Sequence, residues 1–339
     1  MPKIVYLDTL PAENGLEILH SQSKVEIIKI SSSDSEDKCF SILKDAHAYQ
    51  VGAARDEVPR YLQVDKDFLN KTPNLLIVSS GGAGYDTIDV QACTDAGVLV
   101  VNQTGGNAEG VAEHAVAMML NLLKRIQESD LKLRRGWNGS RTDLMGRDLL
   151  NKTVGIVGLG NTGSRVAEIC RLAFNCKILA YDPYIDDHQF IDKKVTQVEI
   201  EELLNKSDVI SVHIPLNKET NNMINKEWFK KMRKGSYFVT TARGSIHNEE
   251  DLYEVITNGH LAGAGLDVWG YEPPPSSHKL LKLDNVIASP HTAGVTQDSR
   301  NKMSEFVATQ LLSLFDGENP ARPVNPEVID TYRNKFKNL

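Results

Sequence analysis

Three short runs in the last third of the sequence carry side chains that could bind an anion and exchange a proton. Arg243 lies in Val-Thr-Thr-Ala-Arg-Gly, Glu272 in Leu-Asp-Val-Trp-Gly-Tyr-Glu-Pro, and His291 in Ser-Pro-His-Thr-Ala-Gly. A guanidinium binds a carboxylate through two directed, charge-assisted hydrogen bonds, and imidazole has an ordinary pKa of about 6.5, close to working pH. Each residue alone has an ordinary alternative: a surface arginine, a solvated glutamate and a structural histidine. They become a chemical set only if the fold brings them to one place.

The elements that precede these runs would bring them to one edge of a sheet. Apolar, β-rich stretches at 236–242, 263–269 and 285–291 predict strands that end at or beside the three runs. Open α/β sheets carry their ligand-binding residues in a crevice at the carboxyl ends of the strands. We therefore expect the arginine, the glutamate and the histidine to meet in one crevice.

The alternation of strands and helices extends over most of the chain and predicts two α/β domains with parallel sheets. The first series of strands is expected at Lys3–Asp8, Val25–Ile30, Ala48–Ala53, Asn74–Ser80 and Leu99–Gln103. The second series is expected at Thr153–Gly158, Lys177–Asp182, Val209–Ile214, Ser236–Ala242, Gly263–Trp269 and Asn285–His291. Six strands with helices between them suggest one complete doubly wound sheet.

Two long helices are expected outside the second series of strands. Apolar spacing predicts a helix over Ala108–Glu128, and a polar stretch follows at Leu133–Arg147. A further helix is expected at about Gln297–Phe315, before a proline-rich tail at Asn319–Pro326. This last helix could return to the first domain.

A glycine-rich turn stands at the start of the second series. The run Gly158-Leu-Gly160-Asn161-Thr162-Gly163 follows a predicted strand and leads into a predicted helix at 164–174. The first glycine permits the tight turn, the second lets a pyrophosphate approach the backbone, and the third lets the helix pack on the strand. A glycine run alone is a weak signal, but the flanking strand and helix are the context of a dinucleotide-binding fingerprint.

Asp182 strengthens this interpretation and favours NAD over NADP. It ends the next predicted strand, about 20 residues after the third glycine, where a ribose-binding acid belongs. A carboxylate accepts hydrogen bonds from ribose hydroxyls and repels a 2′-phosphate. No arginine or lysine is found among the five residues that follow it. The alternative is a solvated aspartate at a strand end.

Composition and charge exclude several other classes. The 339 residues carry a net charge of −7, whereas nucleic-acid binders usually concentrate positive charge. The four cysteines are scattered without a C-x-x-C pair, so we expect no disulfide framework, no zinc or other metal site, and a reducing, cytoplasmic setting. No apolar run approaches the ~20 residues that span a bilayer, and the start lacks the apolar region of a signal peptide. We expect no nucleic-acid or membrane partner.

The sequence resembles the D-isomer-specific 2-hydroxyacid dehydrogenase family over nearly its whole length. The runs Gly82-Ala-Gly84-Tyr-Asp86-Thr-Ile-Asp89 and Asn107-Ala-Glu-Gly-Val111-Ala-Glu113-His114 look like first-domain signatures. The glycine run with Asp182, the run His213-Ile-Pro215-Leu-Asn-Lys-Glu-Thr220, and the spacing of Arg243, Glu272 and His291 fit the cofactor domain. The resemblance implies an NAD-dependent oxidoreductase that transfers a hydride between nicotinamide and a small D-2-hydroxy or 2-oxo acid.

The resemblance also implies roles for the three chemical residues. Arg243 would hold the substrate carboxylate and the 2-oxygen. His291 would exchange a proton with that oxygen. Glu272 would orient His291 and raise its pKa by favouring imidazolium. The cofactor would carry the hydride chemistry itself.

The remaining site residues are carried over in the same way. Asp267 would face the nicotinamide carboxamide, and Thr241 and Ala242 would line the nicotinamide pocket. The cofactor-binding set implied by the resemblance is Gly158, Gly160, Asn161, Thr162, Gly163, Asp182, His213, Pro215, Thr220, Thr241, Ala242, Arg243, Asp267, His291 and Gly294. The backbone N–H groups of Ala83 and Gly84 would bind the substrate carboxylate. Arg55 would contact a second anionic group of the substrate, or it is a surface arginine.

The family further implies an inserted-domain architecture. Residues 1–103 and 296–339 would form a flavodoxin-like substrate-binding domain, and residues 104–295 an inserted Rossmann NAD-binding domain. The helix near Asn107–Lys124 would belong to a homodimerisation arm; its alternative is an ordinary core helix. The run Ser245-Ile-His247-Asn248 departs from the family pattern, and we expect His247 to be a solvated loop residue.

Several functions remain open beside this one. Glyoxylate, hydroxypyruvate, phosphoglycerate-type and longer acids are all candidate substrates. Formate dehydrogenases resemble the family but pair the histidine with glutamine, so Glu272 argues against formate, while phosphite oxidation keeps a similar set. An NAD(H)-sensing, corepressor-like binding protein would keep the whole fold and even the arginine, glutamate and histidine.

Overall fold

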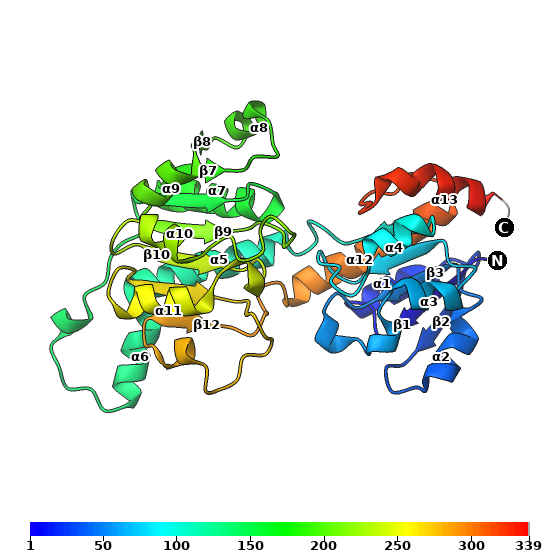
Figure 1. Ribbon diagram of the computed structural model, residues 1–339, viewed down its shortest axis with the longest axis horizontal. Helices are drawn as coiled ribbons and strands as arrows, with labels where there is room; N and C mark the ends of the chain where they lie inside the picture. The colour runs from blue at the N-terminus through cyan, green and yellow to red at the C-terminus, as the bar shows by residue number, and fades with distance from the viewer. Residues whose placement is uncertain (338–339) are drawn as a thin grey trace. The chain divides into compact units, whose positions relative to one another are not determined.

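The computed structural model describes residues 1–337, and the chain divides into two compact units. Residues 1–107 form unit 1 together with the described residues from Thr296 onward, and Ala108–Val295 form unit 2. The boundary expected at 103/104 thus lies four residues before the observed one. Of the expected segment 296–339, residues 338 and 339 lie outside the described residues. Each unit is a sheet with helices on both faces (Figure 1).

Unit 1 is built on a five-stranded parallel sheet in the order β2-β1-β3-β4-β5. This is the flavodoxin-like order. Its strands are β1 (Lys3–Leu7), β2 (Glu26–Ile30), β3 (Ala48–Val51), β4 (Ile77–Ser80) and β5 (Leu99–Val101). One face carries α1 (Glu13–His20), α12 (Gln297–Phe315) and α13 (Ile329–Phe336), and the other carries α2 (Glu36–Leu43), α3 (Lys66–Lys71) and α4 (Val90–Asp95). The expected return of the helix at 297–315 to the first unit is observed, whereas α13 was not expected.

The proline-rich segment after α12 is tied to the edge of this sheet. Asn325 is 1% exposed; its amide oxygen accepts from Val100 N–H at 2.7 Å and its amide nitrogen donates to the Val98 carbonyl at 3.0 Å. Val324 N–H donates to the Val100 carbonyl at 2.8 Å. These bonds satisfy the free edge of β5, and the segment then leads into α13.

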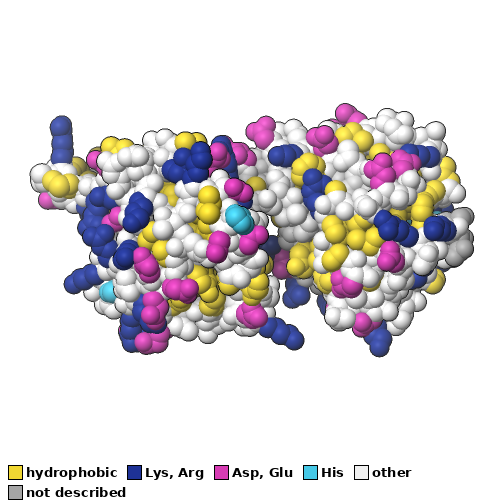
Figure 2. Space-filling model, turned by 90° about the horizontal axis from the view of Figure 1, so that it is seen from above, with side chains coloured by type: hydrophobic (Ala, Val, Ile, Leu, Met, Phe, Trp, Pro, Cys, Tyr) yellow, Lys and Arg dark blue, Asp and Glu magenta, His cyan; other side chains and the backbone are white. Residues whose placement is uncertain are grey.

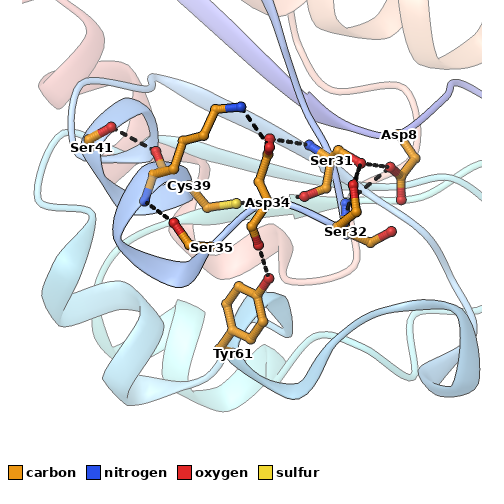
Figure 3. A network of polar contacts seen from close by, with 10 residues as sticks. Asp8, Ser31, Ser32, Asp34, Ser35, Cys39, Ser41 and Tyr61 are labelled. Atoms are coloured by element: carbon orange, nitrogen blue, oxygen red, sulfur yellow. Dashed lines mark hydrogen bonds and ion pairs between the residues drawn. The ribbon is translucent and has the colours of Figure 1, made fainter.

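A polar network closes the carboxyl ends of β1 and β2 (Figure 3). The Asp8 carboxylate accepts from the Ser31 hydroxyl and from Ser32 N–H, each at 3.0 Å. Burial raises the pKa of Asp8, but the hydrogen bonds from Ser32 and Ser31 together lower it below its ordinary value. Tyr61 donates to the Asp34 carbonyl at 2.8 Å, so the network also fixes the entry to α2.

Unit 2 is built on a seven-stranded parallel sheet in the order β12-β11-β10-β9-β6-β7-β8. Its strands are β6 (Thr153–Val157), β7 (Lys177–Tyr181), β8 (Thr196–Gln197), β9 (Val209–Val212), β10 (Tyr237–Thr240), β11 (Gly263–Leu266) and β12 (Val286–Ala288). The helices α5 (Ala108–Lys124), α7 (Asn161–Phe174) and α8 (Asp187–Asp192) pack on one face, and α9 (Ile200–Lys206), α10 (Lys226–Lys231) and α11 (Glu249–Thr257) on the other. The strand order reverses between β6 and β9, as in dinucleotide-binding sheets.

The expected long helix at 108–128 is interrupted. The α5 helix ends at Lys124, Arg125 adopts a left-handed conformation with φ of 55°, and α6 (Ile126–Arg134) begins beyond it. Arg125 is held there by its guanidinium, which donates to both carboxylate oxygens of Glu128 at 2.7 Å. The apolar face of α5 lies in the core of unit 2, which favours the core-helix alternative for α5 itself.

One face of the molecule is mixed in charge. On the face shown in Figure 2, lysine and arginine side chains are interspersed with aspartate and glutamate over each unit. This face therefore offers no continuous cationic stripe of the kind that binds a phosphate backbone. Within residues 1–337, no helix is both long enough and apolar enough to cross a bilayer.

His247 is buried, so the expectation of a solvated loop residue is wrong. Its side chain packs against Phe238 with ring centroids 5.8 Å apart, and the residue is 4% exposed. Neither ring nitrogen has a hydrogen-bond partner within the described chain. The cause is non-local: Ile224 pairs with the backbone on both sides of His247 and draws it into the core. Burial lowers the pKa of His247 to about 4.

This burial predicts a specific acid sensitivity. An unfolded histidine has a pKa of about 6.5, so below that pH the unfolded chain binds a proton at position 247 that the folded chain excludes. The free energy of unfolding should therefore fall as the pH drops from about 6.5 towards 4. Relative to His247→Leu, the parent should lose about 2 kcal/mol more between pH 7 and pH 5, measured by urea denaturation. The matched control is His188→Gln at an exposed position in α8; equal pH dependence in parent and His247→Leu would contradict the prediction.

Candidate active site

The glycine run forms a turn that only glycine fits. Gly158 has φ of +90°, and a Cβ there would lie 2.8 Å from the His213 carbonyl oxygen. A Cβ on Gly163 would lie 2.0 Å from the Gly158 carbonyl oxygen, whereas one on Gly160 would meet no atom within 4 Å. Backbone is thus packed against backbone at the first and third glycines, and the second faces open space. This is the geometry that a pyrophosphate needs for close approach.

The helix after this turn begins earlier than expected. It starts at Asn161, with Gly160 as its N-cap, and not at Ser164. Asn161 and Thr162 therefore belong to the first turn of α7, whose leading N–H groups have no intrahelical partner. An anion at this end of the helix would be stabilised by those N–H groups and by the helix dipole.

Asp182 lies beside this turn at the end of β7. One carboxylate oxygen accepts from Leu159 N–H at 2.8 Å, and the other accepts from Tyr184 N–H at 3.0 Å. The side chain is thereby fixed against the glycine turn with acceptor capacity left for further donors. This arrangement fits a ribose with two adjacent hydroxyls.

The loop after β9 contains the expected His213, Pro215 and Thr220. The Thr220 hydroxyl donates to the Pro215 carbonyl at 2.7 Å and accepts from Asn217 N–H at 2.9 Å, which closes the loop on itself. His213 Nε2 lies 2.8 Å from the Ser211 hydroxyl, and its desolvated surroundings lower the pKa of His213 to about 4. A neutral His213 thus stands next to Gly158.

The end of β10 presents Thr241, Ala242 and Arg243. The Thr241 hydroxyl is buried and has no hydrogen-bond partner within residues 1–337, so a donor or acceptor from a bound molecule would satisfy it. Arg243 donates to the Ala242 carbonyl at 2.7 Å. A Cβ on the next residue, Gly244, would lie 1.9 Å from the Trp269 carbonyl oxygen. The loops after β10 and β11 are therefore in backbone contact.

Glu272 and His291 are hydrogen-bonded to each other at the neighbouring strand ends. His291 Nδ1 lies 2.8 Å from Glu272 Oε2, and Glu272 Oε1 accepts from Trp269 N–H at 2.9 Å. The hydrogen bond that His291 donates to Glu272 raises the pKa of His291 against the opposing effects of burial and of the Arg243 charge. Burial raises the pKa of Glu272, but its bonds to His291 and Trp269 and the charge of Arg243 bring it below its ordinary value. The arginine, the glutamate and the histidine thus act on one another electrostatically, as expected from the strand ends.

Asp267 is buried beneath the turn that carries His291. Its carboxylate accepts from Thr292 N–H at 2.8 Å and from Ala293 N–H at 3.0 Å, and its carbonyl accepts from His291 N–H at 2.7 Å. Gly294 lies within the turn that Val295 N–H closes by donating to the Thr292 carbonyl at 2.9 Å. Sequence reasoning assigned Asp267 only a contact with the carboxamide and missed its hold on the turn, because no local pattern links residues 25 positions apart.

The expected substrate contacts lie in unit 1. Ala83 and Gly84 form the loop after β4; the Ala83 carbonyl accepts from the Asn102 amide at 2.8 Å, and the Gly84 carbonyl accepts from the Ser80 hydroxyl at 2.6 Å. With both carbonyls bound, the N–H groups of the loop are held in place. Arg55 is exposed and donates to the Asp86 carbonyl at 2.6 Å. Within the described chain no cluster of histidine, cysteine, aspartate and glutamate could hold a metal ion.

Comparison with known proteins assigns these features to one family. Residues 116–293 match the D-isomer specific 2-hydroxyacid dehydrogenase, NAD binding domain. Over 331 residues the chain is 34% identical to a glyoxylate reductase of Korarchaeum cryptofilum, which covers 97% of each chain. It is 39% identical to a D-3-phosphoglycerate dehydrogenase of Archaeoglobus fulgidus over 81% of this chain, but it spans only 54% of that protein.

A solved structure agrees with the sequence relatives. The D-lactate dehydrogenase of Aquifex aeolicus, determined with NAD and lactic acid, has a TM-score of 0.78 and 29% identity, and the match covers 95% of this chain and 98% of that one. The glycine turn, Asp182 and the orphaned Thr241 hydroxyl fit the cofactor that the matched domain binds. This chain belongs to the D-isomer specific 2-hydroxyacid dehydrogenase family, and residues 116–293 are its NAD-binding domain.

Proposed function

We propose that the chain is an NAD-dependent dehydrogenase that interconverts a small 2-oxo acid and its D-2-hydroxy acid. The observation that carries the proposal is the hydrogen bond between His291 Nδ1 and Glu272 Oε2 at 2.8 Å, with the charge of Arg243 acting on both residues. A protonatable imidazole beside a fixed guanidinium provides both parts needed to reduce a keto acid, a proton donor and an anion anchor. NADH, when bound, supplies the hydride.

Each residue of the set has one task in this reaction. Arg243 binds the substrate carboxylate and the 2-oxygen through its planar fork of donors. His291 uses Nε2 to give a proton to the 2-oxygen in reduction and to take one in oxidation, because Nδ1 is occupied by Glu272. Glu272 keeps the ring orientation and favours the protonated form.

The other expected site residues divide between cofactor and substrate. Gly158–Gly163 and Asp182 would hold the pyrophosphate and the ribose, and the loop 213–220 with Thr241, Ala242, Asp267 and Gly294 would border the rest of the dinucleotide. Ala83 and Gly84 would bind the substrate carboxylate, with Arg55 near a second anionic group. Glyoxylate, hydroxypyruvate and phosphohydroxypyruvate are the candidate acids, since the chain is 34% identical to a glyoxylate reductase, 37% to a hydroxypyruvate reductase and 39% to a D-3-phosphoglycerate dehydrogenase.

Turnover decides between this enzyme and an NAD(H)-sensing binding protein on the same fold. Purified protein should oxidise NADH with at least one acid from a panel of glyoxylate, hydroxypyruvate, phosphohydroxypyruvate and longer 2-oxo acids. His291→Ala should lower kcat roughly 10²–10⁴-fold, the usual effect of losing a positioned acid, with NADH affinity retained in a fluorescence titration. Tight NADH binding without turnover of any acid would overturn the proposal in favour of the sensor.

The pH profile tests the partnership of Glu272 and His291. The pKa of His291 is raised, so reduction, which needs imidazolium, should hold up to a pH above the ordinary histidine value and fall beyond it. Glu272→Gln removes the charge that favours imidazolium, so the fall in kcat/KM for reduction should move to lower pH. Oxidation should show the mirror-image profile. If kcat/KM for reduction falls at the same pH in Glu272→Gln as in the parent, Glu272 does not set the pKa of His291.

Cofactor preference tests Asp182. NADH should have a higher kcat/KM than NADPH, because the carboxylate at the end of β7 repels a 2′-phosphate. Asp182→Ala should weaken the binding of NADH and strengthen the binding of NADPH. The preference, measured as the ratio of the two Kd values, should therefore become smaller. Equal use of the two nucleotides by the parent would contradict this assignment.

We further propose a homodimer in a reducing compartment, the cytoplasm. Support for the compartment is that all four cysteines are buried thiols. Support for the dimer is a set of large apolar side chains in and after α6, with Ile126 56%, Leu133 64% and Met145 70% exposed. Because the apolar face of α5 is buried, the association surface would be α6 and the segment up to Met145.

Sedimentation equilibrium tests this surface. The parent should have about twice the chain mass of 37.6 kDa. Ile126→Lys with Leu133→Asp should shift it to the monomer, because charges would replace the apolar contact. Leu172→Asp in α7, at a position that is also 64% exposed, is the matched control and should stay dimeric. A monomeric parent would contradict the proposal.

A further inference from the structure

The catalytic turn is linked to α5 by a chain of three side chains. Asp267 Oδ1 accepts from the Ser289 hydroxyl at 2.5 Å, and the Ser289 oxygen lies 2.9 Å from Nε2 of His114 on α5. The exposed fraction of the side chain falls along these contacts, from 30% at His114 to 1% at Asp267. Ser289 lies two residues before His291, and nothing in the sequence signals its contact with a helix 175 positions earlier.

The number of hydrogens available decides which group donates in each of these two hydrogen bonds. A serine hydroxyl has one hydrogen to donate, and that of Ser289 goes to the carboxylate. His114 must therefore carry the hydrogen on Nε2 and donate it to the Ser289 oxygen. The resulting sequence of donors runs from His114 through Ser289 to Asp267, and in such chains each bond polarises the next.

The turn that carries His291, at the Asp267 end of these hydrogen bonds, has a backbone conformation that needs support. His291 has φ of 56°, in the left-handed region that residues other than glycine seldom adopt. Such a conformation persists only where the surroundings over-determine it. Asp267 supplies three backbone anchors to the turn, and Ser289 adds the side-chain anchor at its start.

We propose that Ser289, held between His114 and Asp267, is a positioning residue for His291. The hydroxyl fixes the start of the turn, and α5 in turn fixes the hydroxyl through His114. The imidazole is thereby kept in line with Glu272 before any substrate binds. The inference rests on the proposed function for its kinetic consequence, and on the contacts alone for its structural one.

The kinetic test uses paired variants. Ser289→Ala should lower kcat for 2-oxo acid reduction roughly tenfold, about the effect of one lost hydrogen bond, with the Kd of NADH and the KM of the acid within about twofold of the parent. Ser289→Thr, which keeps the hydroxyl, should restore most of the rate. His114→Leu should behave like Ser289→Ala, whereas His114→Gln, whose amide nitrogen lies the same number of bonds from Cα as Nε2, should not.

Coupling is measured by combining the substitutions. If His114 acts only through Ser289, the double variant His114→Leu with Ser289→Ala should have the same kcat as Ser289→Ala alone. The matched control is Ser236→Ala, which removes a serine hydroxyl of unit 2 that is buried and, unlike that of Ser289, has no partner in the described chain; it should leave kcat unchanged. Additive losses, or a loss confined to the Kd of NADH, would overturn the proposal.

Hydrogen exchange separates failure of this inference from failure of the proposed function. Amides in a peptide spanning residues 286–296 should exchange faster in Ser289→Ala and His114→Leu than in the parent, Ser289→Thr or Ser236→Ala. This readout needs no turnover, so it holds even for a chain that reduces none of the acids. Unchanged exchange in both Ser289→Ala and His114→Leu would overturn the positioning role whatever the parent catalyses.

Discussion

A buried carboxylate must be surrounded by donors, and at Asp267 this requirement shapes the site. Three of the donors are the hydroxyl of Ser289 and the N–H groups of Thr292 and Ala293, so the chain after β12 must curl around the carboxylate. The curl leaves His291 in a left-handed conformation and directs Nδ1 at Glu272. Glu272 is itself fixed by Trp269 N–H, whose loop packs against Gly244 beside Arg243. The hydrogen-bonding requirement of one buried carboxylate thus influences the conformations of the loops after β10, β11 and β12.

The same carboxyl edge of unit 2 holds a second, independent system of backbone contacts. At the glycine turn, Gly158 and Gly163 approach each other and His213 so closely that side chains are excluded. Here the constraint is space and not charge. Directly after β10, the Thr241 hydroxyl is buried and has no partner within residues 1–337. A dinucleotide that begins at the glycine turn would extend toward that hydroxyl and the His291 ring.

Local patterns predicted the features that depend on local chemistry. The expected strands, the glycine run and the spacing to Asp182 follow from periodicity and from the conformational freedom of glycine, and the structure has them in place. Of the strands in residues 1–337, only β8, two exposed residues at the edge of the unit 2 sheet, was not expected. The start of α7 was placed three residues late, because glycine and threonine are weak helix formers that only the closely packed turn holds in helical geometry. The strands β10 and β11 were drawn too long, since apolar residues that follow them, Ala242 after β10 and Val268 and Trp269 after β11, are also buried.

Features set by individual side-chain or strand contacts were beyond periodicity and spacing. Arg125 breaks the long helix because Glu128 captures its guanidinium, and an arginine carries no signal for a left-handed conformation. His247 is polar and lies in a loop, yet its pairing with Ile224 buries it. Ser289 and His114 meet only through the folded sheet. In each case a specific contact between side chains or strands decides the conformation, and the spacing of residue types in the sequence does not predict that contact.

The position of Arg243 also has a thermodynamic consequence. Its charge opposes protonation of His291, while Glu272 favours it. A bound carboxylate on Arg243 would neutralise that opposition, so ligand binding and proton uptake are linked. Linkage of this kind is reciprocal. A bound substrate acid raises the proton affinity of His291, and protonation of His291 raises the affinity for the substrate acid by the same factor. In the proposed reaction the keto acid would therefore recruit the proton that its own reduction consumes.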